Sequence, residues 1–267
     1  QMFFRSFSTI RSSTFSMNDI GEYLNINNNL IKNDKKLYFS EQISLNSIKF
    51  KYPKSSNYIL NDINLTIKKG DIICIIGRSG SGKSTLMDII MGLIPPNSGK
   101  IIIDQTKLSQ SNIHEWRENI AHVPQEILLI DDTIKNNIAF GIPEEEIDIS
   151  KVNFALKLSS LEKDIYKFEK GLNTLVGERG ALLSGGQKQR IGIARAIYQN
   201  KEIIFLDEAT SALDKKTESE ILKNITQKLN KITIIMITHR PRNDINYDKV
   251  IKVKENSIFL NNKESEI

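Results

Sequence analysis

Cysteine is nearly absent from this chain of 267 residues, and several other features are missing with it. The one cysteine, Cys74, lies in the apolar run DIICIIG, so no disulfide framework can form and a buried strand position is expected. No run of about 18 consecutive apolar residues occurs, so the chain as given is not expected to span a membrane. The 37 basic and 32 acidic residues form no block, and a net charge of +5 does not favour a nucleic-acid partner.

Acidic residues are missing from residues 1–18, which contain Arg5, Arg11, many serines and apolar residues at near-helical spacing. Two interpretations stay open for this start. Residues 1–24 are the cytosolic tail of an upstream transmembrane helix, or they are an arginine- and serine-rich targeting segment. Because the chain begins with Gln1, we expect it to be a piece of a longer polypeptide and favour the helix tail.

Composition then divides the chain. Residues 25–42 are polar and rich in asparagine, which indicates a linker. A folded domain is expected over residues 43–260, followed by a short tail over 261–267. Alternating apolar residues in 45–52, and again in 61–67, predict antiparallel strands at the start of the domain.

The rest of the domain has the pattern of an α/β core. Apolar, β-branched runs at 100–104, 202–208 and 232–239 are separated by helical segments, which predicts a parallel sheet buried on both faces. Between about 133 and 198 the pattern is helical, and Pro143 with the three glutamates of 144–146 predicts a helix start. We expect a helical insertion in the core.

The segment GRSGSGKST is predicted to be a phosphate-binding loop, because it matches G-x-x-x-x-G-K-[ST] between an expected apolar strand and an expected helix. Glycines let the backbone N–H groups wrap phosphates, Lys83 offsets phosphate charge, and the Ser84 hydroxyl is a ligand for Mg²⁺. The predicted phosphate contacts are Gly77, Arg78, Ser79, Gly80, Ser81, Gly82, Lys83, Ser84 and Thr85.

Two adjacent acids follow a second apolar strand in EIIFLDEAT. Adjacent acids can simply mark a solvated strand end. A buried strand that delivers two carboxylates into a phosphate site is costly, however, unless Mg²⁺ or water receives them. We therefore expect Asp207 to hold Mg²⁺ and Glu208 to act as the general base on the attacking water.

The stretch LLSGGQKQR resembles a second phosphate cradle, because a serine and two glycines open a run of helix-favouring residues. Free N–H groups at a helix N-terminus point at anions. The predicted contacts are Ser184, Gly185, Gly186 and Gln187. One chain thus carries two cradles, and the residues alone do not say whose phosphate the second one holds.

Taken together, GRSGSGKST, LLSGGQKQR and IIFLDEATSALD resemble, in order and spacing, the ATP-binding domain of ABC transporters over about residues 43–260. The resemblance implies a P-loop NTPase (RecA-like) core with a mixed or parallel sheet. It also implies an N-terminal antiparallel β subdomain, an inserted α-helical subdomain, and ATP and Mg²⁺ as cofactors.

The resemblance also implies roles for four residues outside these loops. Tyr52 in FKYP matches the aromatic residue that stacks on adenine, and Gln125 in HVPQE matches the glutamine that reaches Mg²⁺ and links the site to the membrane part. Asp214 resembles the aspartate at the dimer interface. His239 in ITHR resembles the histidine that contacts the γ-phosphate, and it is predicted to be catalytic together with Lys83 and Glu208.

In the family that the chain resembles, two such domains pack head to tail, and the LSGGQ segment of one touches the ATP on the P-loop of the other. The resemblance therefore assigns the second cradle to the ATP of a second copy of the domain. ATP then joins the two copies, and hydrolysis removes the link.

Three kinds of ABC protein stay open: an exporter or flippase, a separate importer subunit, and a soluble ATPase acting on DNA or ribosomes. VGERG ahead of LSGGQ, and IDDTIKNNIAFG, resemble exporters, and no coiled coil or second motif set favours the soluble class. The exporter interpretation implies a transmembrane domain in the same polypeptide and a place at the cytoplasmic face of a membrane. Residues 122–141 also resemble flippases for lipid-linked oligosaccharides.

Overall fold

A computed structural model describes residues 13, 14, 17, 20, 21, 37–229, 232–238 and 241–261 of the protein. His239, most of the predicted helix tail and linker, and residues 262–267 lie outside the described residues. Within the described part, no helix combines the length and apolar character needed to cross a bilayer.

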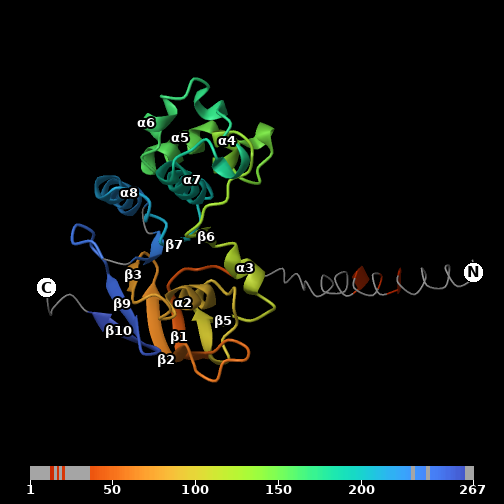
Figure 1. Cartoon of the computed structure of the whole chain (residues 1–267). Helices are drawn as coiled ribbons and strands as arrows, with labels where there is room; N and C mark the ends of the chain where they lie inside the picture. Colours follow the sequence, from red (N-terminus) through yellow and green to blue (C-terminus); the bar gives the residue numbers. More distant parts are fainter. Residues whose placement is uncertain are drawn as a thin grey trace, which may run out of the picture.

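The described chain alternates short strands and helices and forms two lobes, one rich in strands and one rich in helices (Figure 1). The strands are β1 (Gln42–Phe50), β2 (Leu60–Lys68), β3 (Ile72–Ile76), β4 (Ser98–Ile103), β5 (Thr106–Lys107), β6 (Ile120–Val123), β7 (Ile203–Asp207), β8 (Thr233–Ile237), β9 (Lys249–Lys254) and β10 (Ser257–Asn261). The helices are α2 (Lys83–Ile90), α3 (Ile113–Arg117), α4 (Ile134–Ile138), α5 (Ile149–Leu158), α6 (Glu162–Ile165), α7 (Gly185–Tyr198) and α8 (Lys215–Lys228).

The larger sheet has the order β10-β9-β3-β8-β7-β6 and is parallel except for the β9–β10 hairpin. Its central strands are apolar except for Thr233 at the start of β8 and Asp207 at the end of β7, and β8 is buried at every position. Such strands are expected where both faces of a sheet are covered. The parallel strands predicted at 202–208 and 232–239 are confirmed.

The smaller sheet is antiparallel, with the order β2-β1-β4-β5. Its β1–β2 pair confirms the antiparallel strands predicted at the start of the domain. The prediction for residues 100–104 was wrong, because β4 lies in this sheet, where Ile43 pairs with Ile103.

A tight turn after β4 continues the smaller sheet. After β4 the chain reverses at Asp104, whose φ of 52° lies in the left-handed region, and returns at once as β5. A turn this short joins only antiparallel strands. The Asp104 carboxylate also accepts hydrogen bonds from the backbone N–H groups of Ser40, Glu41 and Gln42 at 2.8–2.9 Å, which fastens the start of β1 to this turn.

The helical insertion is present between β6 and β7, and α4, α5, α6 and α7 form the upper lobe (Figure 1). The helix start predicted at Pro143 was wrong by several residues. Glu144–Glu146 form only a 3₁₀ turn, and α5 begins after Asp148. Asp148 is the N-cap of α5, because its carboxylate accepts hydrogen bonds from the N–H groups of Ser150 and Lys151.

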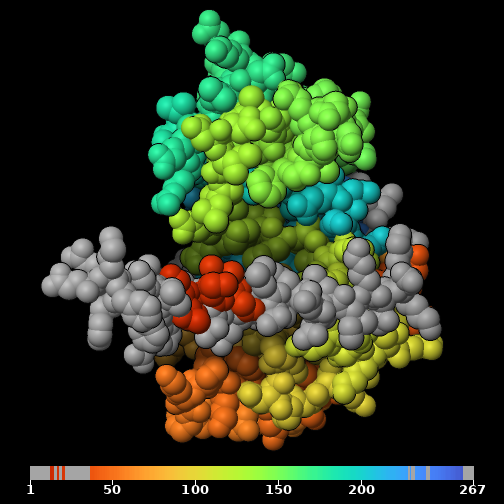
Figure 2. Space-filling view, turned by 90° about the vertical axis from the view of Figure 1, so that its right-hand side faces the viewer, coloured from red at the N-terminus to blue at the C-terminus, as the bar shows by residue number. Residues whose placement is uncertain are grey.

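Two hydrophobic cores share the larger sheet as a common wall. Ile73 and Ile75 on β3 face the core that contains α2 and the smaller sheet, whereas Cys74 faces the core beneath the helical lobe. Burial raises the pKa of the Cys74 thiol to about 12, in agreement with the predicted buried strand position. From the side of α3 the two lobes form an upper and a lower mass (Figure 2).

The first core extends beyond the predicted start of the domain. Leu37 and Phe39, which the sequence placed in the linker, are buried, and the Phe39 ring lies edge-on to Trp116 at 6.1 Å between centroids. The Asn119 side-chain amide donates to the carbonyl oxygen of Leu37 at 2.9 Å. The chain is therefore anchored to α3 before β1 begins.

Candidate nucleotide site

The loop between β3 and α2 has the geometry of a phosphate cradle, because its glycines occupy positions that a side chain would disturb. Gly82, immediately before α2, has φ 99°, and a Cβ there would lie 2.8 Å from Cγ2 of Ile59. A Cβ at Gly77 would lie 2.6 Å from the carbonyl oxygen of Val253. The backbone can wrap an anion here only without these side chains.

Lys83 is held inside the loop. Its ammonium group donates to the carbonyl oxygens of Gly77 and Arg78, both at 3.1 Å, and only 6% of the residue is exposed. A lysine ammonium has three donors. With two of them fixed by the loop backbone, the remaining donor and the positive charge point toward an anion in the cradle.

A cavity of about 420 Å³ opens over this loop and joins residues far apart in the sequence. Its lining consists of Tyr52, Ile59, Ser79, Gly80, Gly82, Lys83, Ser84, Thr85, Gln125 and Glu208. A volume of this size is ordinary for a small-molecule site. Tertiary structure thus brings the phosphate loop together with three separately predicted residues.

Tyr52 lies at the edge of this cavity and is not a core residue, since 42% of it is exposed. Its hydroxyl group and the Thr85 hydroxyl group are 3.2 Å apart, and the Phe50 ring packs against it edge-on, with centroids 5.0 Å apart. These two contacts fix the ring beside the phosphate loop.

The strand end of β7 brings two carboxylates to the same place. Burial, and then the charge of Glu208, raise the pKa of Asp207, while a hydrogen bond from Ser84 and the charge of Lys83 act in the opposite direction. A carboxylate whose pKa is raised is incompletely compensated by the protein. It is therefore suited to receive a cation.

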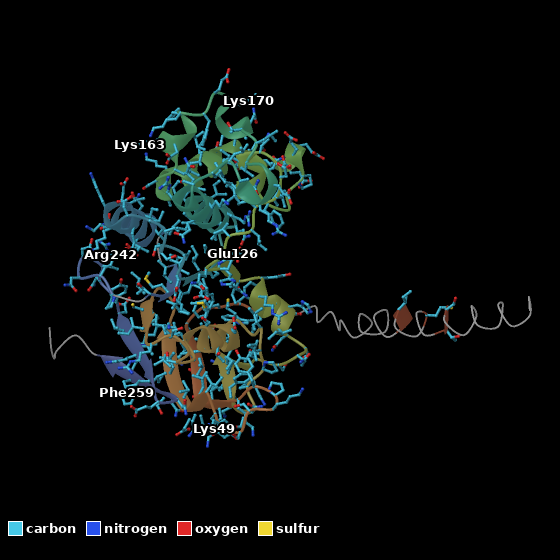
Figure 3. All side chains as sticks on the ribbon, viewed as in Figure 1. Lys49, Glu126, Lys163, Lys170, Arg242 and Phe259 are labelled. Carbon is cyan, nitrogen blue, oxygen red and sulfur yellow. The ribbon has the colours of Figure 1, made fainter. Side chains whose placement is uncertain are left out.

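Glu208 is held in an unusual conformation. Its φ is 48°, in the left-handed region, and its carboxylate oxygen Oε2 accepts a hydrogen bond from the Gln125 amide at 3.0 Å. A non-glycine residue in that region is strained, which is common at functional sites. Gln125 follows β6 and Glu208 follows β7, so this hydrogen bond joins the ends of two neighbouring strands of the larger sheet. Glu126, the neighbour of Gln125, lies where the two lobes meet (Figure 3).

The donor set fits Mg²⁺. Ser84, Asp207 and Gln125 offer a hydroxyl, a carboxylate and an amide oxygen, which are the hard ligands that Mg²⁺ takes. Among the described residues, no cluster of three or more His, Cys, Asp or Glu side chains could hold a metal by itself. Mg²⁺ commonly binds through one or two carboxylates together with phosphates and water, and Asp207 offers one such carboxylate.

The second cradle is a helix N-terminus of regular geometry. The Ser184 side chain caps α7 by accepting from the Gln187 N–H at 3.2 Å, and the Gln187 side chain accepts from the Ser184 N–H at 2.9 Å. This capping box leaves the first helical N–H groups, at Gly185 and Gly186, without intrahelical partners. Residues 184–187 do not line the cavity over the phosphate loop.

Asp214 also begins a helix. Its Oδ1 accepts from the N–H groups of Lys216 and Thr217, each at 3.0 Å, and Oδ2 accepts from the Thr217 hydroxyl at 2.7 Å. These bonds, with that of the Thr217 hydroxyl the largest, lower the pKa of the Asp214 carboxyl. Asp214 therefore caps α8 as an ionised residue on the surface, and its role at a dimer interface stays a prediction.

One residue in LLSGGQKQR escaped the sequence prediction. Gln189 is buried, and its side chain bonds to both Ser211 and Ala212 in the loop after β7. A signal was available, since helical spacing puts Gln189 on the same face of α7 as the buried Ile193 and Ile197. A polar residue on a buried helix face needs hydrogen-bond partners.

A second cavity, of about 530 Å³, lies beside the helical lobe. Leu128 and Phe140 in its lining are 70% and 49% exposed. Arg195 forms one wall, with its guanidinium carbon 4.8 Å from the centre of the Phe140 ring and its Nε donating to the Asn137 carbonyl at 2.8 Å. This surface combines large exposed apolar groups with one fixed cation.

A family model described as ABC transporter matches residues 60–211, which is more than half of the chain. The chain is 46% identical over 238 residues to the multidrug resistance-like ATP-binding protein MdlA of Buchnera aphidicola, a match covering 87% of this chain and 41% of that protein. It is 40% identical over 225 residues to the Toxin RTX-I translocation ATP-binding protein of Actinobacillus pleuropneumoniae, with 84% and 32% covered.

Among solved structures, the fold matches a bacterial Atm1-family ABC exporter with ATP bound, with a TM-score of 0.84 and 30% identity. That match covers 94% of this chain and 44% of the other. The chain therefore spans well under half the length of the relatives it matches.

Proposed function

The chain belongs to the ABC transporter family and carries its ATPase domain, and we propose that it hydrolyses ATP to power export across a membrane. The observation that carries the proposal is the cavity shared by Tyr52, the phosphate loop, Gln125 and Glu208. Four separate stretches of sequence meet there with an aromatic ring at one edge and a carboxylate at another. ATP has matching parts, a base and a triphosphate.

ATP binding follows from the lining. The adenine ring stacks on the exposed face of Tyr52, and the phosphates enter the loop of 77–85, where the backbone N–H groups and Lys83 neutralise their charge. Ser84, Asp207 and Gln125 are the groups that would hold Mg²⁺, which would supply further neutralisation of phosphate charge when bound.

Hydrolysis requires a base for the attacking water. We assign that role to Glu208, whose carboxylate lines the cavity and is oriented by the Gln125 amide. The carboxylate accepts a proton from water as the water oxygen attacks the terminal phosphorus and the bond to ADP breaks. His239, outside the described residues, is assigned to the γ-phosphate on the family resemblance alone.

The second cradle belongs to the ATP of a second copy. Ser184 through Gln187 do not line the cavity of their own chain, yet their free N–H groups and the Ser184 hydroxyl suit an anion. A head-to-tail dimer puts this segment, with Asp214 nearby on the loop that follows β7, against the ATP of the partner. Each composite site then needs both chains.

Export requires a membrane part, and we propose that the exposed apolar cavity around Leu128 and Phe140 docks it. In this arrangement residues 1–24 continue from a transmembrane helix, 25–42 link it to the ATP-binding domain of 43–260, and 261–267 form a tail. The domain then lies at the cytoplasmic face of the membrane.

The exported substrate is chosen by the membrane part. Two of the matched relatives carry names of multidrug resistance and toxin translocation. The alternative of a lipid or lipid-linked oligosaccharide flippase depends on the resemblance of residues 122–141, and it stays a prediction. Substrate-stimulated ATPase activity of the protein with its membrane part, compared for such lipids and for peptides, distinguishes the two.

Mixed dimers test the composite site. Lys83→Ala damages the first cradle and Ser184→Arg blocks the second, both in a Glu208→Gln background that preserves bound nucleotide. Each homodimer has two damaged sites, whereas a mixed dimer collects both lesions in one site and leaves the other whole. The domains should be tethered, or studied at high concentration, because isolated domains lack the effective concentration that a membrane part provides.

We expect verified mixed dimers to retain about one ATP, counted by nucleotide extraction after rapid desalting, and each homodimer to retain none. The Glu208→Gln parent serves as the positive control. If the parent traps ATP and the mixed dimers trap none, the composite site is refuted.

A further inference from the structure

The loop between β7 and α8 is tied to the second cradle by one buried side chain. The Gln189 amide nitrogen donates to the Ser211 hydroxyl oxygen at 3.0 Å, and its Oε1 accepts from the Ala212 N–H at 2.8 Å. Only 6% of Gln189 is exposed. Both ends of the amide therefore bond to this loop, at Ser211 and Ala212, which lie 22 and 23 residues further along the chain.

The glycines of the cradle touch the same loop. A Cβ built on Gly185 would lie 3.6 Å from the Ala212 side chain, and one on Gly186 would lie 3.4 Å from the Ala212 carbonyl oxygen. Gln189 stands one helical turn after Gly185, on the same side of α7. Ala212 is thus held by the helix start on one side and by the Gln189 amide on the other.

The surface formed by the second cradle and the loop of 211–214 faces outward. Ser184 and Gly185 are exposed, and so are Ser211, Ala212 and Asp214 in the loop. Figure 1 shows α7 above the end of β7, away from α2 and the phosphate loop. The surface formed by 184–186 and 211–214 is therefore available to a second chain.

We propose that Gln189 is a positioning residue that fixes the second cradle and the loop of 211–214 in one orientation toward the partner's ATP. The inference rests on the proposed composite site and adds the side chain that sets its geometry. Two glycines have no side chains of their own to orient the helix start against the loop. The paired hydrogen bonds of a buried amide provide that orientation, and their loss leaves buried polar groups unsatisfied.

Gln189→Met tests this role, because methionine keeps the length and helix preference of glutamine but forms neither hydrogen bond. Gln199→Met is the matched control, since Gln199 is exposed at the end of the same helix. We expect Gln189→Met to weaken ATP-dependent dimerisation at least ~10-fold in the Glu208→Gln background, because two hydrogen bonds are lost. ATP binding to the single chain should be unchanged, as should Gln199→Met in both assays.

Ser211→Ala guards against a folding defect, because it removes only the partner of the amide nitrogen and lies on the surface. We expect Ser211→Ala to weaken ATP-dependent dimerisation about threefold, because it removes a single hydrogen bond. Thermal melting of all three variants checks that each is folded. Dimerisation of folded Gln189→Met and Ser211→Ala equal to that of the parent would overturn the proposal.

Mixed dimers then separate a role toward the partner's ATP from a role toward the chain's own ATP. If Gln189 acts on the partner, Gln189→Met paired with Lys83→Ala leaves one whole site, and paired with Ser184→Arg it leaves none. If Gln189 acts within its own chain, the pattern is reversed. The reversed pattern refutes the proposal, while failure of Lys83→Ala with Ser184→Arg refutes the composite site itself.

Discussion

The two phosphate cradles of this chain differ in what surrounds them. The first, at 77–85, is a cavity lined by a buried lysine, the Glu208 carboxylate and an aromatic ring drawn from separate segments. The second, at 184–187, is an exposed helix start whose serine and glutamine side chains cap the helix itself. The first offers charge and catalysis, and the second offers only neutral donors.

That difference supports different roles for the two cradles in the proposed dimer. A triphosphate bound at the first cradle would already meet Lys83, the proposed base Glu208 and the proposed metal ligands, so on the proposed function it binds there before the dimer forms. The cations beside the second cradle are engaged elsewhere: the Lys188 ammonium donates to the Arg179 carbonyl oxygen at 3.1 Å, and the Arg190 guanidinium donates to the Asp164 carboxylate at 2.6 Å. It therefore gains by meeting a phosphate that another chain has already bound.

Removing the base from the first cradle should give the largest effect. Glu208→Gln keeps the volume and the contact with Gln125 but cannot accept a proton, so we expect hydrolysis at least ~10²-fold slower with ATP binding retained. Phosphate release and equilibrium binding of a fluorescent ATP analogue measure the two quantities. Turnover near that of the unchanged protein would remove Glu208 from this role.

The aromatic edge of the first cradle should have the next largest effect. Stacking of a base on an aromatic ring contributes about 1–3 kcal/mol, so Tyr52→Ala should weaken ATP binding about 5- to 150-fold. Tyr52→Phe keeps the ring while losing the contact with the Thr85 hydroxyl, and it should bind ATP nearly normally. Calorimetric titration of single chains gives both constants, and equal affinities for Ala and Tyr at position 52 would argue against stacking.

The cap of the second cradle should matter for stability rather than for ATP binding by one chain. Ser184→Ala removes the acceptor for the Gln187 N–H and should cost about 1 kcal/mol in the free energy of unfolding. Ser184→Thr keeps a capping hydroxyl and serves as the control. Urea unfolding measures the stability. A weaker single-chain affinity for ATP in Ser184→Ala would connect the second cradle to its own site and break the comparison.

The smallest effect concerns the negative charge of the Asp207 carboxylate at the first cradle. The folded-state pKa of Asp207 is raised, so its ionised form destabilises the nucleotide-free fold at pH 7, and the cost disappears below the ordinary pKa of aspartate. Asp207→Asn, which has no charge to lose solvation, should therefore raise the melting temperature at pH 7.

Calorimetry with a chelator present, repeated at acid pH where the gain should vanish, checks this sign. A lower melting temperature for Asp207→Asn at pH 7 would mean that Ser84 and Lys83 already compensate the carboxylate. In that case the Asp207 carboxylate would have no uncompensated charge to attract a cation, and the first cradle would resemble the second in this respect.

The sequence by itself determined the phosphate loop, the central strands and the cap of α7, because each depends on residues close together in the chain. Spacing of glycines, lysine and serine specifies a strand, loop and helix locally, and apolar β-branched runs specify buried strands. The family resemblance then added Tyr52 and Gln125, which the structure brings to the same cavity.

Only the tertiary structure decided which sheet received residues 100–104 and what Gln189 contacts. An apolar β-branched run has the same local character in either sheet. Pairing of β4 with the distant β1 placed it in the smaller sheet, and the short reversal at Asp104 then added β5 antiparallel to it. The partners of Gln189 lie more than 20 residues away in sequence, in a loop positioned by β7 and α8. Periodicity marks a buried polar side chain, but its partner is set by packing between elements.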